Sequence, residues 1–308
     1  MFGMDKHKIL PVFVGALLIL LFLAPFFVPK FLVSVLIIAN VFAILAMSWD
    51  ILSGYTGQLS FGHSFFVGLG GYASGMLNIY LHFPIWLSMI AGALMALVGG
   101  LIMGIPALRL RGPYFSVVTM VLPIIAFRLV MVYSKYTGGE LGVGGVEALS
   151  MSQTTNYYYS LIFMVFTAAL LLVIAKSRWG LIFQAIREDE DAVVETGKNT
   201  AKFKIISFCF SSGLSGLGGA FLVHYLMGIS PGAILDLNVT IEIVIAAIVG
   251  GMGTIWGPIA GGYFLIISRE YLRFLGEWRM FTFAVIALVL MLYSPQGISS
   301  LRLKSKRP

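Results

Sequence analysis

The chain has 308 residues, of which 59% are hydrophobic and only 11% are charged. A soluble domain carries about 25% charged and roughly 45–50% apolar residues, so a soluble fold of this length could not hide this much apolar surface from water. The formal net charge is +7, but the basic residues cluster at segment ends and in the C-terminal tail, as membrane topology requires, so we expect no nucleic-acid partner.

Apolar runs of membrane-spanning length recur along the chain. Residues 9–28 and 31–49 carry no charge, and each run reaches the roughly 20 residues that a transmembrane helix needs. Further candidate spans lie at 63–80, 84–106, 114–133, 157–176, 205–227, 241–267 and 280–294. Backbone in lipid must be satisfied within a helix or a closed barrel, and these runs are too uniformly apolar for barrel strands. The predicted fold is an all-α polytopic integral membrane protein with about 8–10 transmembrane helices, in a single domain covering 1–308.

The charge distribution predicts that both termini are cytoplasmic. With Lys6 and Lys8 inside, alternate crossings place the arginines after the fourth span and the charged stretch 176–204 inside, and the loop 134–156 outside. Nine complete crossings would leave the basic tail outside. We therefore expect a re-entrant hairpin within 241–267, entered from the outer face, so that the last span returns the tail to the cytoplasm.

Glycine interrupts two membrane segments, at 53–62 and at 250–258, and glycine and proline break helices. Paired breaks in the two halves of a transporter indicate pseudo-repeats that meet at a transport pathway. The pathway candidates in these breaks are Gly54, Gly57, Gln58, Ser60, Gly62, His63, Gly250, Gly251, Gly253 and Gly257. Close helix packing is the alternative explanation for most of the glycines.

The cytoplasmic stretch 176–204 is polar and mixed in charge. Its six basic and five acidic residues give a net charge of +1, so attraction to anionic lipid is not its main use. Apolar residues spaced through it predict short helices lying on a protein surface, with a solvated loop as the alternative. We expect Gly197 to end the second helix in a left-handed conformation.

This stretch resembles the cytoplasmic loop of permease subunits in branched-chain amino acid ABC importers. In that family an Ala-Ile-Arg-Glu-Asp-Glu run precedes a Glu-Ala-Ala-x-x-x-Gly type element, and this chain has Asp for the first Glu and Val for the second Ala. The resemblance implies that the element docks on an ATPase subunit, with Ala192 and Val193 entering a groove. The implied coupling residues are Arg187, Glu188, Asp189, Glu190, Asp191, Ala192, Val193 and Gly197.

Further blocks resemble the same family in the same order, from the Asn40 region to the ending Pro295, Gln296 and Gly297. The match is closest to the LivM type of its two homologous permeases. The resemblance implies a LivH-like partner permease, cytoplasmic ATPase subunits and an extracytoplasmic solute-binding protein, assembled in the lipid bilayer of a bacterial or archaeal cytoplasmic (inner) membrane. It also implies leucine, isoleucine and valine as solutes, with other amino acids, urea or short amides as alternatives.

The sequence predicts a transport subunit without enzymatic activity or cofactor. It contains no Gly-x-x-x-x-Gly-Lys-Ser/Thr run, so we expect ATP hydrolysis in separate subunits. Cys209 is the only cysteine, and neither His63 nor His224 has a second ligand at metal spacing, so no metal site is expected. A membrane enzyme would need a clustered catalytic set, which the sequence does not offer.

Few charged residues fall near the predicted spans. Asp50 and Glu242 are predicted at span ends, which disfavours a self-sufficient secondary transporter, because such proteins place coupling carboxylates deep in a span. Arg128 lies within 114–133 near its outer end, where it either snorkels to the interface or serves the pathway.

Overall fold

A computed structural model describes residues 19–107, 110, 112–276, 278, 282 and 285. Residues 19–27 are helical, and the other helices are α2 (Lys30–Thr56), α3 (His63–Leu81), α4 (Ile85–Ala107), α5 (Pro113–Val132), α6 (Ser134–Thr137), η1 (Gly139–Leu141), α7 (Gln153–Lys176), α8 (Arg178–Glu188), α9 (Glu190–Glu195), α10 (Thr200–Leu226), α11 (Pro231–Ile234), α12 (Leu237–Gly250), α13 (Trp256–Tyr271) and η2 (Leu272–Leu275). The basic residues Arg109 and Arg111, the first half of 9–28, the predicted span 280–294 apart from 282 and 285, and the tail lie outside the described residues.

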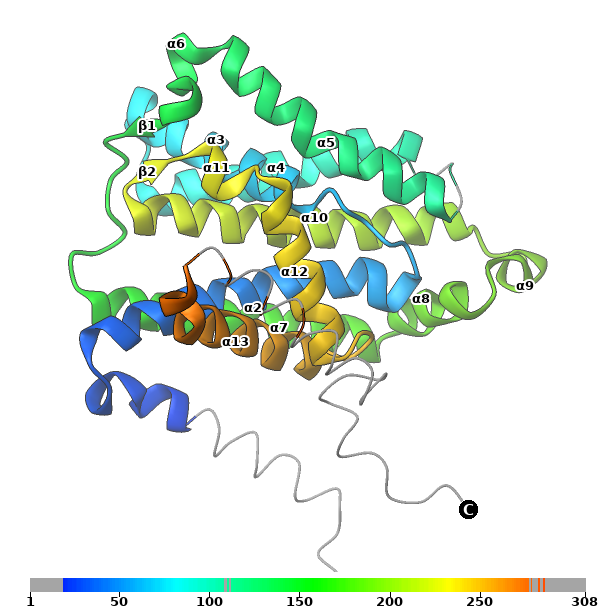
Figure 1. Cartoon of the computed structure of the whole chain (residues 1–308). Helices are drawn as coiled ribbons and strands as arrows, with labels where there is room; N and C mark the ends of the chain where they lie inside the picture. The colour runs from blue at the N-terminus through cyan, green and yellow to red at the C-terminus, as the bar shows by residue number, and fades with distance from the viewer. Residues whose placement is uncertain are drawn as a thin grey trace, which may run out of the picture.

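The prediction of an all-α polytopic membrane protein is confirmed. Within the described residues, six segments are long and apolar enough to cross a membrane, namely Lys30–Thr56, Ile85–Ala107, Pro113–Val132, Gln153–Lys176, Thr200–Leu226 and Pro231–Gly250. The long helices α2, α7, α10 and α13 run along one common direction, whereas α12 crosses them steeply (Figure 1). Helices α8 and α9 project at one end, called the inner end here, and β1 and β2 lie at the opposite, outer end (Figure 1).

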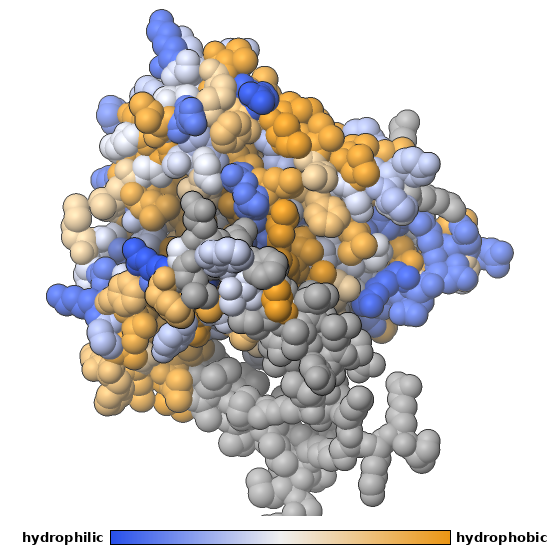
Figure 2. Space-filling view, viewed as in Figure 1, coloured by the Kyte–Doolittle hydropathy of each residue, from blue (hydrophilic) through white to orange (hydrophobic). Residues whose placement is uncertain are grey.

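Helix α2 occupies the centre of the bundle. Every residue of its second half, from 39 to 56, is buried, and it packs against α7, α10, α12 and α13. A helix that is apolar on all sides belongs in a protein interior rather than against lipid. Helix α5 is the opposite case, because Val117, Val121 and Ile125 on its surface are 61%, 43% and 50% exposed. Figure 2 shows an apolar surface over α5, as expected for a face in contact with hydrocarbon.

Small residues let several helices touch backbone to backbone. A Cβ atom on Gly70 would lie 2.3 Å from the carbonyl oxygen of Gly216, and one on Gly219 would lie 2.0 Å from that of Val67. Helices α3 and α10 therefore approach more closely than any side chain larger than hydrogen permits. This confirms the packing role for these glycines, whereas the two glycine-containing breaks have a different geometry, described below.

The outer loop is fixed to the bundle. Strand β1 (Val143–Gly144) pairs antiparallel with β2 (Gly228–Ile229). The His224 ring contacts the carbonyl oxygen of Glu147 through Nδ1 at 2.9 Å and Ser74 Oγ through Nε2 at 3.0 Å. Thus the loop predicted at 134–156 is ordered, and His224 has a structural role at its base.

One helix boundary differs from the prediction in a way that matters for function. The predicted span 31–49 ends seven residues before α2 does, because the sequence alone favours a carboxylate such as that of Asp50 at a membrane interface. In the structure Asp50 is fully buried inside the helix, and Gly54 is also helical. Arg128 is exposed on α5 near the outer end.

Candidate translocation and coupling site

The first glycine-containing break is an extended segment between α2 and α3. Gly57 caps α2 with a φ of 74°, which glycine adopts without steric cost. The chain then turns back along the bundle before α3 begins (Figure 1). Trp49 Nε1 donates to the carbonyl oxygen of Ser60 at 2.7 Å, so the segment lies beside the last two turns of α2.

Side-chain hydroxyls satisfy the backbone of this extended segment. Ser53 Oγ donates to the carbonyl of Gln58 at 2.8 Å, and Ser116 Oγ donates to that of Leu59 at 2.7 Å. The amide of Phe61 donates to Thr119 Oγ1 at 3.1 Å. Non-helical backbone at membrane depth is tolerated only where protein or water supplies such partners. The break is therefore a built feature rather than a disordered turn.

The second break is the tip of a helical hairpin, which confirms the predicted interruption of 241–267. Helix α12 ends at Gly250, and α13 begins at Trp256. A Cβ on Gly261 would lie 1.8 Å from the carbonyl oxygen of Ala246, so the two helices pack backbone to backbone. Helix α12 reaches the about 20 residues that span a bilayer only together with α11, as Pro231–Gly250, and α13 has 16 residues. Their tip points toward the inner ends of α2 and α8, in agreement with a re-entrant hairpin entered from outside.

The two breaks meet at one junction, which also includes the cytoplasmic stretch. The amide of Gly253 donates to Asp50 Oδ1 at 2.8 Å, and Arg187 Nη1 donates to the carbonyl oxygen of Gly54 at 2.5 Å. A Cβ on Gly253 would lie 2.7 Å from Arg187 Nη1. We call Asp50, Gly54, Arg187 and Gly253 the inner junction. Because Arg187 of α8 binds Gly54 and lies against Gly253, a displacement of α8 would move residues at both broken segments.

The cytoplasmic stretch forms the short helices that its apolar spacing predicts. Ser177 caps α8, and Asp189 caps α9 by accepting from the amide of Ala192 at 3.0 Å. The two caps end one helix and begin the next without an intervening loop. Gly197 follows α9 with a φ of 79°, which confirms the predicted left-handed conformation.

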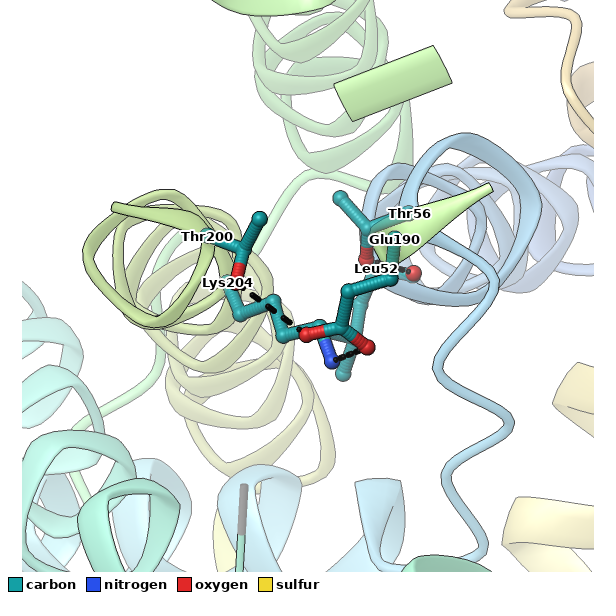
Figure 3. Close-up of polar contacts among 5 residues, drawn as sticks. All are labelled: Leu52, Thr56, Glu190, Thr200 and Lys204. Carbon is teal, nitrogen blue, oxygen red and sulfur yellow. Dashed lines mark hydrogen bonds and ion pairs between the residues drawn. The ribbon is translucent and has the colours of Figure 1, made fainter. Parts of the chain in front are cut away.

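Helix α9 is tied to the base of α10 by one buried ion pair. Lys204 Nζ lies 2.5 Å from Glu190 Oε2, and the lysine side chain is only 3% exposed. Thr200 Oγ1 donates to the other carboxylate oxygen of Glu190 at 3.2 Å. In Figure 3 the carboxylate lies between these two groups. Because breaking a buried pair leaves an uncompensated charge, this contact fixes the position of α9.

Val193, one of the predicted coupling residues, is not on the exposed surface where we expected it. Val193 is 7% exposed and belongs to the core, whereas the adjacent Ala192 is exposed. Successive helical residues point about 100° apart, so the two side chains do not enter one external groove together in this conformation. The exposed apolar side chains on α8 and α9 are instead Trp179, Leu181 and Val194, at 42%, 65% and 50% exposure.

The structure separates the predicted pathway residues into two groups. Gly54, Gly57, Gly250, Gly251, Gly253 and Gly257 lie at or beside the inner junction, and Gln58 follows Gly57 in the first break. Ser60, Gly62 and His63 pack elsewhere and are buried. His63 Nε2 lies 2.7 Å from Ser211 Oγ of α10. In this conformation the second group holds α3 in place.

Sequence reasoning did not identify Asp50 as a member of the site. Its only signal was a carboxylate between apolar residues, which equally suits a helix end. The residue that Asp50 contacts lies 203 positions away in the chain. No group of metal-binding side chains occurs among the described residues.

Comparison with known proteins places this chain among transport permeases. A family model described as branched-chain amino acid transport system / permease component matches residues 31–294. The high-affinity branched-chain amino acid transport system permease protein LivM of Escherichia coli (strain K12) is 27% identical over 93% of this chain and 74% of the relative. The LivH permease of Salmonella typhimurium is 25% identical over 85% of this chain and 92% of the relative. No solved structure matches the chain.

Proposed function

This chain belongs to the family of permease components of branched-chain amino acid transport systems, and from that premise we propose that it is the LivM-type permease subunit of an ATP-driven importer. It forms the translocation pathway with a homologous, LivH-like permease. Cytoplasmic ATPase subunits bind the stretch 176–204, and an extracytoplasmic binding protein delivers leucine, isoleucine or valine. The assembly lies in the cytoplasmic membrane of a bacterium or archaeon.

The inner junction is the observation that supports this proposal most directly. Arg187 lies in the stretch that the ATPase would bind, and it donates to the carbonyl of Gly54 at 2.5 Å. Asp50 connects the same place to the tip of the α12–α13 hairpin through Gly253. ATP-driven movement of α8 would thus pull on both broken segments at once. Together these segments would open or close the inner end of the pathway.

The charge and exposure of the two ends agree with separate partners. The α8–α9 end is hydrophilic and projects from the apolar body (Figure 2), and Leu181 adds an exposed apolar contact for an ATPase subunit. At the outer end, Leu141 and Met151 are 95% and 90% exposed on an ordered loop. A solute-binding protein would contact this outer loop.

A secondary transporter is the rival function, and the buried carboxylate of Asp50 is the observation that favours it. Intramembrane carboxylates mark ion pathways in many transporters. Here Asp50 Oδ1 accepts the Gly253 amide, a contact that holds two segments together without ion coupling. ATP-independent, gradient-driven uptake by the chain alone would support the rival. Urea, short amides and other amino acids remain the alternative solutes within the importer family.

The coupling role is tested with Ala192→Trp and Gly197→Val in a complex reconstituted with the partner permease and ATPase subunits. We expect both changes to abolish leucine-stimulated ATP hydrolysis while membrane insertion and permease pairing persist. A tryptophan would fill the exposed contact at Ala192, and valine would be strained at a φ of 79°. ATPase retention in a pull-down and ATPase rates in liposomes are the measurements.

Gly112→Val is the matched control. Gly112 also has a positive φ, 59°, and an added Cβ meets nothing within 4 Å, but it lies outside the stretch 176–204. It should retain the ATPase and its stimulation. Normal retention and stimulation in both test variants would place the coupling element elsewhere in the chain.

A further inference from the structure

A cavity of about 570 Å³ lies in the outer half of the bundle, away from the inner junction. Its walls come from the first half of α2, the last turn of α10, the helix α11, the start of α12 and the end of α13. Ligand pockets for small molecules have volumes of about 300–1,000 Å³. We call this space the outer cavity. Neither glycine-containing break lines it.

The floor of the outer cavity is closed toward the inner end. A Cβ on Gly262 would lie 2.8 Å from the backbone nitrogen of Ala43, so α13 and α2 are in backbone contact just below it. The hydroxyl of Tyr263 also donates to Asn40 Oδ1, which connects the same two helices. A solute in the outer cavity would therefore rest above a closed passage.

One wall is apolar. Val35, Ile38 and Phe42 line it from one face of α2, at the three- and four-residue spacing that places side chains on a common stripe. Leu222 and Ile266 complete the wall from α10 and α13. This surface has the size and character to accept a branched aliphatic side chain.

The opposite wall carries charges of both signs. Arg269 Nη1 donates to both carboxylate oxygens of Glu242, at 3.2 and 3.0 Å. This contact uses one terminal nitrogen of the guanidinium, and the arginine side chain stays 43% exposed. Asp236 and Glu270 line the same cavity, and Arg273 pairs with Glu270 at 3.2 Å. Among the described residues, three carboxylates and the guanidinium groups of Arg269 and Arg273 therefore leave this wall with an excess of one negative charge.

We propose that the outer cavity binds a zwitterionic α-amino acid with an apolar side chain before it passes the inner junction. Arg269 takes the solute carboxylate through its second terminal nitrogen, and Glu242 holds the guanidinium in position. Asp236 and Glu270 attract the ammonium group, while the α2 wall holds the aliphatic side chain. This inference rests on the proposed import function, because it assigns a site to the solute of that importer.

The pairing of charges explains why such a site would prefer an amino acid over a solute that lacks its carboxylate or its ammonium group. A guanidinium and a carboxylate form charge-assisted hydrogen bonds, which are roughly twice as strong as neutral ones. A net negative wall disfavours a solute that carries only a carboxylate. An amine without a carboxylate leaves Arg269 without its second partner.

The test follows the labelling of a single cysteine introduced into the cavity wall. In a Cys209→Ser background, Ser34→Cys places one thiol on the cavity wall. Right-side-out proteoliposomes carrying the permease pair and ATPase, but no binding protein, are treated with a membrane-impermeant thiol reagent. We expect leucine to slow labelling at position 34. The analogues 4-methylpentanoate and 3-methylbutylamine, which lack the ammonium and the carboxylate respectively, should need about tenfold higher concentrations.

Two further variants assign the effect to the site. Arg269→Gln should remove leucine protection and leave the labelling rate without leucine unchanged, and Arg269→Lys should restore part of it. Arg128→Gln is the matched control, because Arg128 is exposed on α5 and does not line the outer cavity. A thiol introduced as Met151→Cys on the outer loop should label at the same rate with and without leucine.

The outcomes separate this inference from the proposed function. If the complex with its binding protein imports leucine with ATP but leucine never protects position 34, the cavity is not a solute site and the import function stands. Labelling that never reaches position 34 from outside would also overturn the inference, because the site must open outward. If ATP drives no leucine uptake at all, the proposed function itself is wrong.

Discussion

The two glycine-containing breaks have similar residue types, yet they hold their backbone in different ways. In the first, between Gly57 and Gly62, serine and threonine hydroxyls on α2 and α5 bind the exposed peptide groups. In the second, at the tip of the α12–α13 hairpin, glycines adopt positive φ angles and one carboxylate accepts a peptide N–H. Within the second break, Thr254 Oγ1 also donates to the carbonyl oxygen of Gly251 and accepts the amide of Gly257. The first break thus depends on side chains of the helices around it, and the second depends mainly on its own residues and on Asp50.

The difference teaches where movement can occur. A segment held by several hydroxyls on two helices resists displacement, because each lost bond leaves a buried peptide group unsatisfied. The hairpin tip is held at the inner junction by the Asp50 carboxylate and lies against Gly54 and Arg187. We therefore expect the second break to move during transport and the first to act as a fixed support.

Gly253→Leu gives the largest expected effect. The position has a φ of 76°, and its Cβ would lie 2.7 Å from Arg187 Nη1, so leucine both strains the backbone and displaces the arginine from Gly54. We expect ATP-driven leucine uptake to fall by at least about tenfold. Gly144→Leu is the control, since a Cβ there meets nothing within 4 Å. Wild-type uptake in both variants would contradict a mobile junction.

Thr119→Val should lower stability with a smaller effect on uptake. Its hydroxyl accepts the amide of Phe61 at 3.1 Å, and an unsatisfied buried N–H costs about 1–3 kcal/mol. The thermal unfolding midpoint of the purified permease pair should drop, and Thr119→Ser should keep it. Equal midpoints for the valine and serine variants would show that the hydroxyl does not support the first break.

Gly57→Ala gives the smallest expected effect. The φ of 74° disfavours alanine, but the nearest atom to its Cβ, Arg187 Cγ, is 3.4 Å away. A left-handed residue other than glycine costs roughly 1–2 kcal/mol, and 1 kcal/mol corresponds to about a fivefold change. Uptake should fall by about that factor. A loss as large as that of Gly253→Leu would remove the distinction between the two breaks.

The helices themselves could be predicted well from hydropathy. The predicted spans 63–80, 84–106 and 114–133 agree with α3, α4 and α5 within one residue at each end, because these segments are bounded by turns rich in polar residues, glycine or proline. The end of α2 could not be placed in this way. Inside that helix Asp50 Oδ1 accepts the Gly253 amide, and that partner is not visible in local sequence.

The sequence by itself determined the membrane class, most helix positions, the family and the short helices within 176–204, because each depends on local composition or on a contiguous motif. The tertiary structure alone decided which of the marked residues meet. Asp50, Arg187 and Gly253 lie far apart in the chain, and only the folding of the hairpin against α2 and α8 brings them together. The outer cavity also exists only in three dimensions, because five of the described helices supply its walls and no single segment carries its pattern of charges and apolar side chains.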